Sequence, residues 1–432
     1  MMGKYGKKRQ YMTLKDAKTI SQQDVLFTST QKYMNWFAFF SVFPLIKIGG
    51  ISITFFIFII IAYKFLKRKK KLFRVTQWTD IFLILFLLFV SIAAILTEES
   101  YRDRSVFSII KLMTQYVYWV VLALFIKTWI YNFNFYKLSR AIFYASVVSI
   151  LYYAFLNPFY PIFYPNSFAY AIVTAMPLGY YYVMKRFSIP MILLISVAFV
   201  LGVMYSGSRT GTALTIFELM LLLSLGNKQL KKASMLTGIF TLPVIIVMFL
   251  SVDQSHIRYI KLGLADMLED YSPKISHTLR MEENILNRDK SLLIRKLMIQ
   301  KGEKIFEEHP FFGIGLGNFM YYYTSLDIAS VSHWLHQSEK NYNRRSSQNS
   351  YLMILAEDGI FALLSLLTVF LIILWKGFYY VKSFRNNAEI YIYIPFVALL
   401  FYGIILVTVQ GALFWLLMGL SLTLTQRKRH LS

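Results

Sequence analysis

A short polar turn between two long apolar stretches carries the first residues suited to chemistry, Gly207-Ser208-Arg209-Thr210-Gly211. The guanidinium of Arg209 offers N–H donors in a fixed fork that matches phosphate oxygens. Gly207 and Gly211 permit a tight turn and close approach of a ligand, and Ser208 and Thr210 add hydroxyls. The turn therefore indicates an anion-binding site, although an arginine reaching for lipid headgroups is equally compatible with it.

A second arginine lies in the long polar segment that follows residue 252. Apolar side chains recur at helical spacing over residues 291–308, which predicts an amphipathic helix with Arg295 beside its apolar stripe. Arg295 is either aimed into a site or is a solvated helix charge. The position alone favours the solvated alternative.

Two histidines and a tryptophan follow in the same polar segment. His333 and His336 could share one helix face, but no further ligand cluster accompanies them, so we expect neither a metal nor a cofactor. Trp334 between them could stack on a sugar ring, although anchoring at the membrane interface is the commoner use. Glu357 lies close to hydrocarbon, where carboxylates are costly and often functional.

Three alternating glycines, Gly313, Gly315 and Gly317, resemble a dinucleotide fingerprint only superficially. The G-x-G-x-G spacing differs from that motif, and the context of a strand before and a helix after is missing. We predict a glycine-rich turn that returns the chain to the membrane. His309, beside a proline, is expected to end the preceding helix.

The composition places these residues in a membrane protein. Of the 432 residues, 57% are hydrophobic, more than a soluble domain can bury. Cysteine is absent, which excludes disulfides and thiol chemistry. The net charge of +24 does not indicate a nucleic-acid partner, because residues 253–349 hold 13 Lys/Arg and 12 Asp/Glu, and the excess lies in tails and short loops.

Twelve apolar stretches are expected to cross the membrane, whose hydrocarbon core of ~30 Å needs about 20 helical residues. The sequence therefore predicts an all-α integral membrane protein with about twelve transmembrane helices and a long extracytoplasmic loop between spans nine and ten. The expected spans are 34–47, 50–66, 79–97, 106–126, 138–157, 167–184, 189–206, 210–226, 233–252, 350–375, 390–408 and 409–425. The expected divisions are an arm at 1–33, spans one to nine within 34–252, a loop at 253–349, spans ten to twelve within 350–425, and a tail at 426–432.

Basic clusters fall on alternate gaps between these spans, counting the N-terminal arm first. The positive-inside rule then places both termini in the cytoplasm, with the Arg209 turn and the long loop outside. The clusters lie near residues 4–9, 67–71, 127–140, 185–186, 228–232, 376–385 and 427–429.

In this order, these motifs resemble the O-antigen ligase and polymerase family, the Wzy/WaaL-like membrane glycan transferases. The match rests on the 207–211 turn after span seven and on Arg295 upstream of residues 309–319. It also rests on Asn349-Ser350-Tyr351-Leu352, followed by Glu357-Asp358-Gly359.

The resemblance implies a GT-C-like helical fold in the bacterial cytoplasmic membrane. It implies transfer of glycan from a polyprenyl diphosphate-linked oligosaccharide to a sugar hydroxyl at the outer face, with membrane lipids and other polysaccharide assembly proteins as partners. By position, Arg209 and Arg295 would bind the diphosphate. Asn349 and Tyr351 would contact substrate.

One position departs from the family pattern. The ligase branch carries His-Asn where this chain has Gln348-Asn349, and glutamine cannot accept a proton at neutral pH. His333 or His336 could replace that base, Glu357 could serve instead, or the diphosphate could leave with little base assistance. The missing histidine favours a polymerase that joins lipid-linked repeat units, or a divergent relative, over a typical lipopolysaccharide ligase.

Two other activities remain as alternatives. One is a ligase that attaches finished glycan to a lipid or protein acceptor. The other is a glycolipid transporter or flippase, which the concentration of charge at the outer boundary and the lack of duplicated halves make less favoured.

Overall fold

The computed structural model describes most of the chain and shows an almost entirely helical protein. The described residues are 14–44, 47–48, 51–68, 70–96, 106–157, 164–225, 231–232, 234–239, 290–324, 345–383, 388–404, 407–408 and 411–426. The long helices are α1 (Leu14–Val42), α2 (Ile53–Lys67), α3 (Trp78–Ile95), α4 (Val106–Trp129), α5 (Phe135–Phe155), α6 (Pro165–Arg186), α7 (Ile189–Tyr205), α8 (Arg209–Leu225), α12 (Lys290–Glu308), α14 (Ser350–Ser383), α15 (Ile390–Gly403) and α16 (Ala412–Leu422). The described part of the chain also holds the 3-10 turns η2 (Ile130–Asn132) and η5 (Thr423–Thr425) and an antiparallel hairpin of β1 (Lys47–Ile48) and β2 (Ile51–Ser52).

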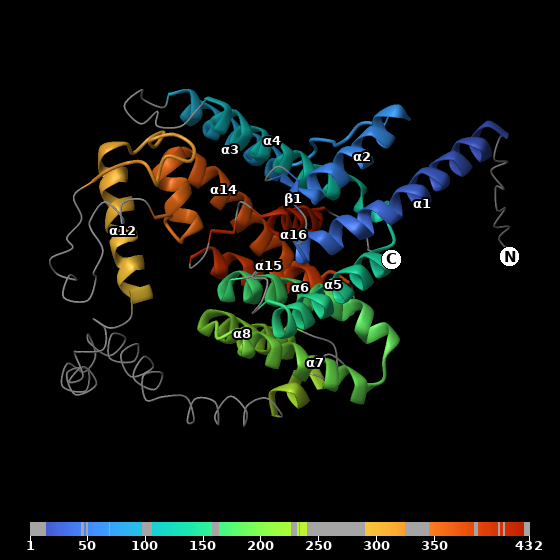
Figure 1. Ribbon diagram of the computed structural model, residues 1–432. Helices are drawn as coiled ribbons and strands as arrows, with labels where there is room; N and C mark the ends of the chain where they lie inside the picture. Colours follow the sequence, from blue (N-terminus) through green and yellow to red (C-terminus); the bar gives the residue numbers. More distant parts are fainter. Residues whose placement is uncertain are drawn as a thin grey trace, which may run out of the picture.

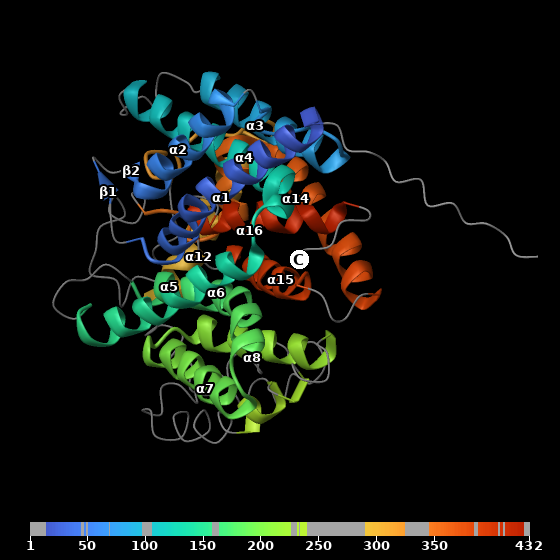
Figure 2. The same cartoon turned by 90° about the vertical axis from the view of Figure 1, so that its right-hand side faces the viewer.

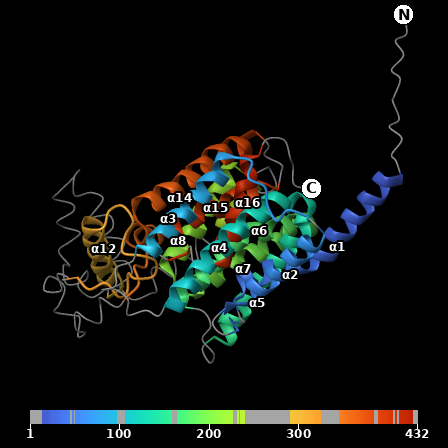
Figure 3. The ribbon, with the colours of Figure 1, turned by 90° about the horizontal axis from the view of Figure 1, so that it is seen from above.

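The helices pack as a bundle with the C-terminal helices at its centre. Helices α14, α15 and α16 lie between the group of α3 and α4 and the group of α5 to α8 (Figures 1 and 2). Figure 3 shows α12 at one end of the bundle and the start of α1 at the other. The site residues predicted on α8, α12 and α14 therefore depend on how one end of this bundle is assembled.

Among the residues that the structure describes, four helices are long and apolar enough to cross a membrane, namely 78–95, 109–132, 135–155 and 350–383. Four shorter apolar helices accompany them, at 189–205, 210–222, 390–403 and 412–425. These helices describe a multi-pass membrane protein, and the total of twelve spans stays a prediction. Buried aromatic side chains fill the centre, where Trp119 on α4 stacks on Trp415 on α16 with ring centroids 6.2 Å apart.

Local side chains set where several helices begin. The hydroxyl of Ser52 accepts a hydrogen bond from the Thr54 N–H at the start of α2 (3.3 Å), and the Asn134 side chain accepts from the Lys137 N–H at the start of α5 (3.0 Å). Such caps satisfy N–H groups that have no partner inside the helix.

Two predicted spans differ from the observed elements or lie beyond them. The first span was expected at 34–47, whereas α1 runs from Leu14 to Val42 and ends just before Pro44. Proline lacks an N–H and disfavours helical geometry in the residue before it, so the helix stops there. Most of the ninth predicted span, 233–252, lies outside the described residues.

Candidate functional site

The turn between α7 and α8 is a helix cap fixed against α6. Ser208 is buried, and its Oγ accepts a hydrogen bond from the Gly211 N–H (3.2 Å) and donates to Oδ1 of Asn166 (2.8 Å). Gly207 adopts a positive φ of 71° with open space around it, whereas a Cβ on Gly211 would lie 2.5 Å from that of Ala169. The turn is thus packed on one side and open at Gly207.

The predicted ligand residues of this turn occupy the first positions of α8. Arg209 is the first residue of that helix, and its side chain lies outside what the structure describes. Thr210 follows and is half-buried. The local fold therefore places the backbone of Arg209 at the first position of a capped helix.

Helix α15 connects this turn to the start of α14. A Cβ on Gly211 would lie 2.9 Å from the hydroxyl of Tyr402, and one on Gly403 would lie 3.1 Å from Cζ of Tyr351. The Tyr351 hydroxyl donates to the carbonyl of Leu400 (2.7 Å). The glycine turn and the substrate motif predicted at residues 349–352 thus pack on the same last turn of α15.

The start of α14 is capped by Asn349, another predicted substrate residue. Its Oδ1 accepts from the backbone N–H groups of Tyr351 (2.9 Å) and Leu352 (3.0 Å). The preceding residue, Gln348, has a left-handed backbone with φ of 53°, which non-glycine residues rarely adopt. Such strain occurs preferentially at functional sites.

Helix α12 confirms the predicted amphipathic helix and packs against this end of α14. A Cβ on Gly302 would lie 2.4 Å from Cδ1 of Leu352, so the two helices are in close contact. Arg295 precedes Gly302 by seven residues, or about two turns, and therefore lies on the same face. Arg295 is half-buried, and its Nε is screened from solvent.

The glycine-rich segment, residues 309–319, docks on a break in α14. Gly359 interrupts that helix with φ of 78°, and a Cβ there would lie 2.1 Å from the carbonyl oxygen of Phe311. The Ile314 N–H donates to the carbonyl of Ala356 (3.0 Å). The predicted glycine-rich turn is confirmed, and it pairs with the chain's own backbone.

The side chain of Glu357 holds the same segment. Glu357 is 3% exposed, and its two carboxylate oxygens accept from the N–H groups of Gly317 (2.8 Å) and Phe319 (3.1 Å). Lys301 on α12 is buried with its Nζ 5.0 Å from the Phe319 ring centroid. Burial lowers the pKa of Lys301 to about 7, and the nearby Glu357 charge opposes that shift.

Residues 194–367 match the family model described as O-antigen ligase. This segment belongs to the O-antigen ligase domain family. The match runs from α7 into α14, and so contains the glycine turn, α12, the glycine-rich segment and the α14 cap. No curated protein sequence matches the chain. The activity class given by the family is glycan transfer of the O-antigen ligase or polymerase type.

Within the O-antigen ligase domain, the structure brings some predicted site residues together, and other predicted site residues lie outside the part it describes. Helix α15 and the α12–α14 contact link the glycine turn, the cap at Asn349 and the helix that carries Arg295. His333, Trp334 and His336 lie outside the described residues.

Sequence reasoning missed two residues of this region. Lys301 stands three residues after Met298 and four before Ile305, so its spacing already placed it on the apolar stripe of the amphipathic helix. Tyr402 has no such local signal, because its role depends on contact between α15 and the distant turn.

Proposed function

We propose that this protein is a polysaccharide polymerase that transfers glycan from a polyprenyl diphosphate carrier to a sugar hydroxyl of another lipid-linked repeat unit. The observation that carries the proposal is the convergence at one end of the bundle. There α15 joins the turn before α8 to the start of α14, and the Arg295 face of α12 packs directly against that start of α14. The O-antigen ligase match to the segment holding these elements supports the same class of chemistry.

The reaction explains why two arginines would serve this end of the molecule. The acceptor hydroxyl oxygen bonds to the anomeric carbon as the bond from that carbon to the diphosphate oxygen breaks. The diphosphate leaves with the electron pair and gains negative charge. Guanidinium groups of Arg209 and Arg295, held at a site of low dielectric, would bind the diphosphate and stabilise that charge.

The remaining predicted residues would position the two lipid-linked glycans. Asn349 and Tyr351 form the rim of the site at the start of α14, and Thr210 adds a hydroxyl beside the arginine turn. Trp334 would stack on a sugar ring. The open space at Gly207 leaves room for a ligand to approach the turn.

The proton of the acceptor hydroxyl needs a different carrier from the histidine of the ligase branch. We assign it to His333 or His336, because both oxygens of Glu357 already accept backbone hydrogen bonds. Glu357 then acts as a positioning residue that holds the glycine-rich segment on α14.

The charge distribution supports an outer location for this site, with both termini in the cytoplasm. The donor and acceptor would therefore be lipid-linked units already on the outer face, and no nucleotide sugar is needed. A ligase acting on finished glycan is the second candidate, favoured by the description of the matching family.

The glycan profile of cells lacking the protein tests the proposal. We expect wild type to restore a polymer ladder, and Arg209→Ala or Arg295→Ala to lower polymer about a hundredfold or more while protein remains in the membrane. Lys296→Ala, an exposed neighbour on α12, and Arg186→Ala, an exposed residue at the far end of α6, are charge-matched controls.

The lipid-linked product separates the outcomes. Accumulation of single repeat units indicates a polymerase, and long lipid-linked chains that never reach an acceptor indicate a ligase. Normal polymer from both arginine variants would overturn the assignment of the diphosphate site.

A further inference from the structure

A polar cavity lies at the opposite end of the bundle from the glycan-transfer site. Helix α3 relates the two ends: Phe89 stacks on Phe361 beside the glycine-rich segment (5.5 Å), whereas Gln77 at the helix start donates to the carbonyl of Thr425 (3.1 Å). The cavity at the Gln77 end has a volume of about 440 Å³. That volume lies within the range of small-ligand sites, roughly 300–1,000 Å³.

A fixed strap of chain between α2 and α3 forms the rim of this cavity. The indole N–H of Trp129 donates to the carbonyls of Lys71 (3.1 Å) and Leu72 (3.0 Å), and the Arg74 N–H donates to the Thr128 hydroxyl (3.2 Å). The Arg74 guanidinium lies 5.8 Å from the Trp129 ring centroid. The backbone contacts therefore hold Arg74 over α4 at the mouth of the cavity.

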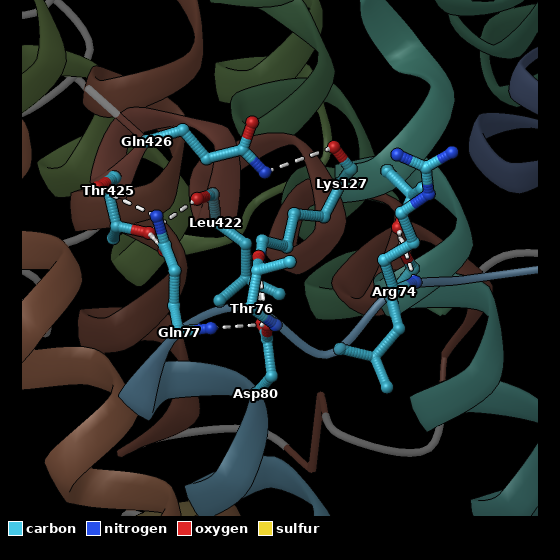
Figure 4. Close-up of polar contacts among 10 residues, drawn as sticks. Arg74, Thr76, Gln77, Asp80, Lys127, Leu422, Thr425 and Gln426 are labelled. Carbon is cyan, nitrogen blue, oxygen red and sulfur yellow. Dashed lines mark hydrogen bonds and ion pairs between the residues drawn. The ribbon is translucent and has the colours of Figure 1, made fainter.

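The floor beneath the strap is electrically neutral. Lys127 is buried and pairs with the buried carboxylate of Asp80, whose Oδ1 lies 2.6 Å from Nζ, and it also donates to the Thr76 hydroxyl (3.2 Å). The Gln426 amide N–H donates to the Lys127 carbonyl (3.4 Å), as Figure 4 shows, and Gln426 itself lines the cavity. Because Asp80 neutralises Lys127, the charge of the cavity comes from Arg74.

The lining has the character of an anion site. None of the residues that line the cavity is acidic, and among the described residues no carboxylate forms an ion pair with Arg74. The exposed amide of Asn132 stands on the same lining. A guanidinium with an amide beside it suits a phosphate oxygen and its ester neighbours.

The location favours a phosphate carried by a lipid. Lys67 ends α2, and Arg68, Lys70 and Lys71 lie in the strap ahead of Arg74, so by the positive-inside rule this end faces the cytoplasm. Anionic headgroups concentrate at that surface, and Trp129 is a residue type enriched at the membrane interface. We propose that this cavity binds the phosphate of an anionic phospholipid of the cytoplasmic leaflet, with Arg74 as its principal contact and Asn132 as a second. This site is independent of the proposed glycan transfer.

Lipid titration of the full-length protein tests the site. The protein is purified in neutral detergent, and thermal unfolding and native mass spectrometry are followed as phosphatidylglycerol or phosphatidylcholine is added. We expect phosphatidylglycerol to bind and to raise the unfolding temperature, and Arg74→Gln to require about tenfold more of it, the loss of one charge-assisted contact. Lys71→Gln removes the same charge from an exposed neighbour outside the lining, and should bind as wild type does.

Further titrations distinguish the phosphate of a lipid from a soluble phosphate. Inorganic phosphate and glycerol 3-phosphate are titrated in parallel, and stabilisation by either at the same concentration as the lipid would overturn the lipid assignment. If Arg74→Gln and Lys71→Gln weaken phosphatidylglycerol binding equally, the attraction is diffuse and the site is overturned.

Should Arg74→Gln fail to fold, Asn132→Leu replaces it, since it changes the exposed lining without changing charge. Unaltered phosphatidylglycerol affinity in Asn132→Leu would then refute the cavity.

Discussion

Two glycine motifs within residues 194–367 have opposite surroundings. At Gly207 a positive φ of 71° is surrounded by open space. At Gly313 a positive φ of 65° is combined with close packing, since a Cβ there would lie 2.5 Å from the carbonyl oxygen of Ala356. The comparison shows that glycine spacing identifies a special backbone, but does not say whether a ligand or the protein itself occupies the space.

The hydrogen bonds of the two motifs explain this difference. The turn is closed by local bonds, such as the Gly207 N–H to the carbonyl of Met204 (2.9 Å). The glycine-rich segment is closed by long-range bonds, with the Gly315 N–H donating to the carbonyl of Glu357 (2.9 Å). A segment whose donors already bind α14 has few left for a phosphate, whereas a locally closed turn keeps one side free.

The largest expected contrast comes from alanine at Gly207 and at Gly359, the α14 glycine on which the glycine-rich segment packs. Gly359→Ala places a Cβ 2.1 Å from the Phe311 carbonyl oxygen, so α14 and the glycine-rich segment must separate, and we expect a loss of about 3 kcal/mol or more. Gly207→Ala creates no steric clash, and its cost is only the strain of a left-handed backbone at a residue with a Cβ, about 1–2 kcal/mol. Thermal unfolding in detergent measures both, and equal shifts would contradict the difference drawn between the motifs.

The next contrast concerns the carboxylate that holds the glycine-rich segment. A positioning role predicts that Glu357→Gln, which keeps one acceptor oxygen, lowers polymer formation about tenfold, and that Glu357→Ala lowers it further. A general base would lose about a hundredfold or more in both variants, because neither can accept the proton. Initial rates of polymer formation with purified lipid-linked substrate separate these roles, and identical large losses would restore Glu357 as the base.

A smaller effect separates structure from chemistry within the Gly207–Gly211 turn. Ser208→Ala removes the cap at the start of α8 and the bond to Asn166, so we expect about 1 kcal/mol of destabilisation. Thr210→Ala should leave the unfolding temperature unchanged and weaken the apparent affinity for lipid-linked substrate. If the two variants change stability alike, the assignment of Ser208 to the fold and Thr210 to the ligand is wrong.

The last prediction is a pH dependence of the contact between α12 and α14. Burial lowers the pKa of Lys301 to about 7, so the folded state binds fewer protons than the unfolded chain between about pH 7 and the ordinary lysine pKa of about 10.4. Stability should therefore rise as pH increases from 7 to 9, and the full penalty of the buried charge remains below pH 7. Lys301→Met should remove this dependence, whereas Lys304→Met, a charge-matched change one turn away, should keep it. A wild-type unfolding temperature that falls between pH 7 and 9 would refute the predicted direction of the pH dependence.

The sequence by itself determined the features that depend on local pattern. Hydropathy located most of the apolar helices, including α7 at 189–205 against the expected 189–206. Helical periodicity located α12 within one residue of its start. The exception was α1, where a polar helical segment joins the apolar one, because hydropathy reports burial in lipid and does not report where a helix begins.

The tertiary structure alone decided which residues meet at the ends of the bundle. Glu357 was a candidate base in the sequence, but its partners at Gly317 and Phe319 are about forty residues away. Tyr402 beside Gly211, and Thr425 beside Gln77, are separated by still longer stretches of chain. Hydrogen bonds and close packing between residues so far apart in the sequence form only when the helices assemble. Local patterns of polarity specify each helix, but they do not specify its neighbours.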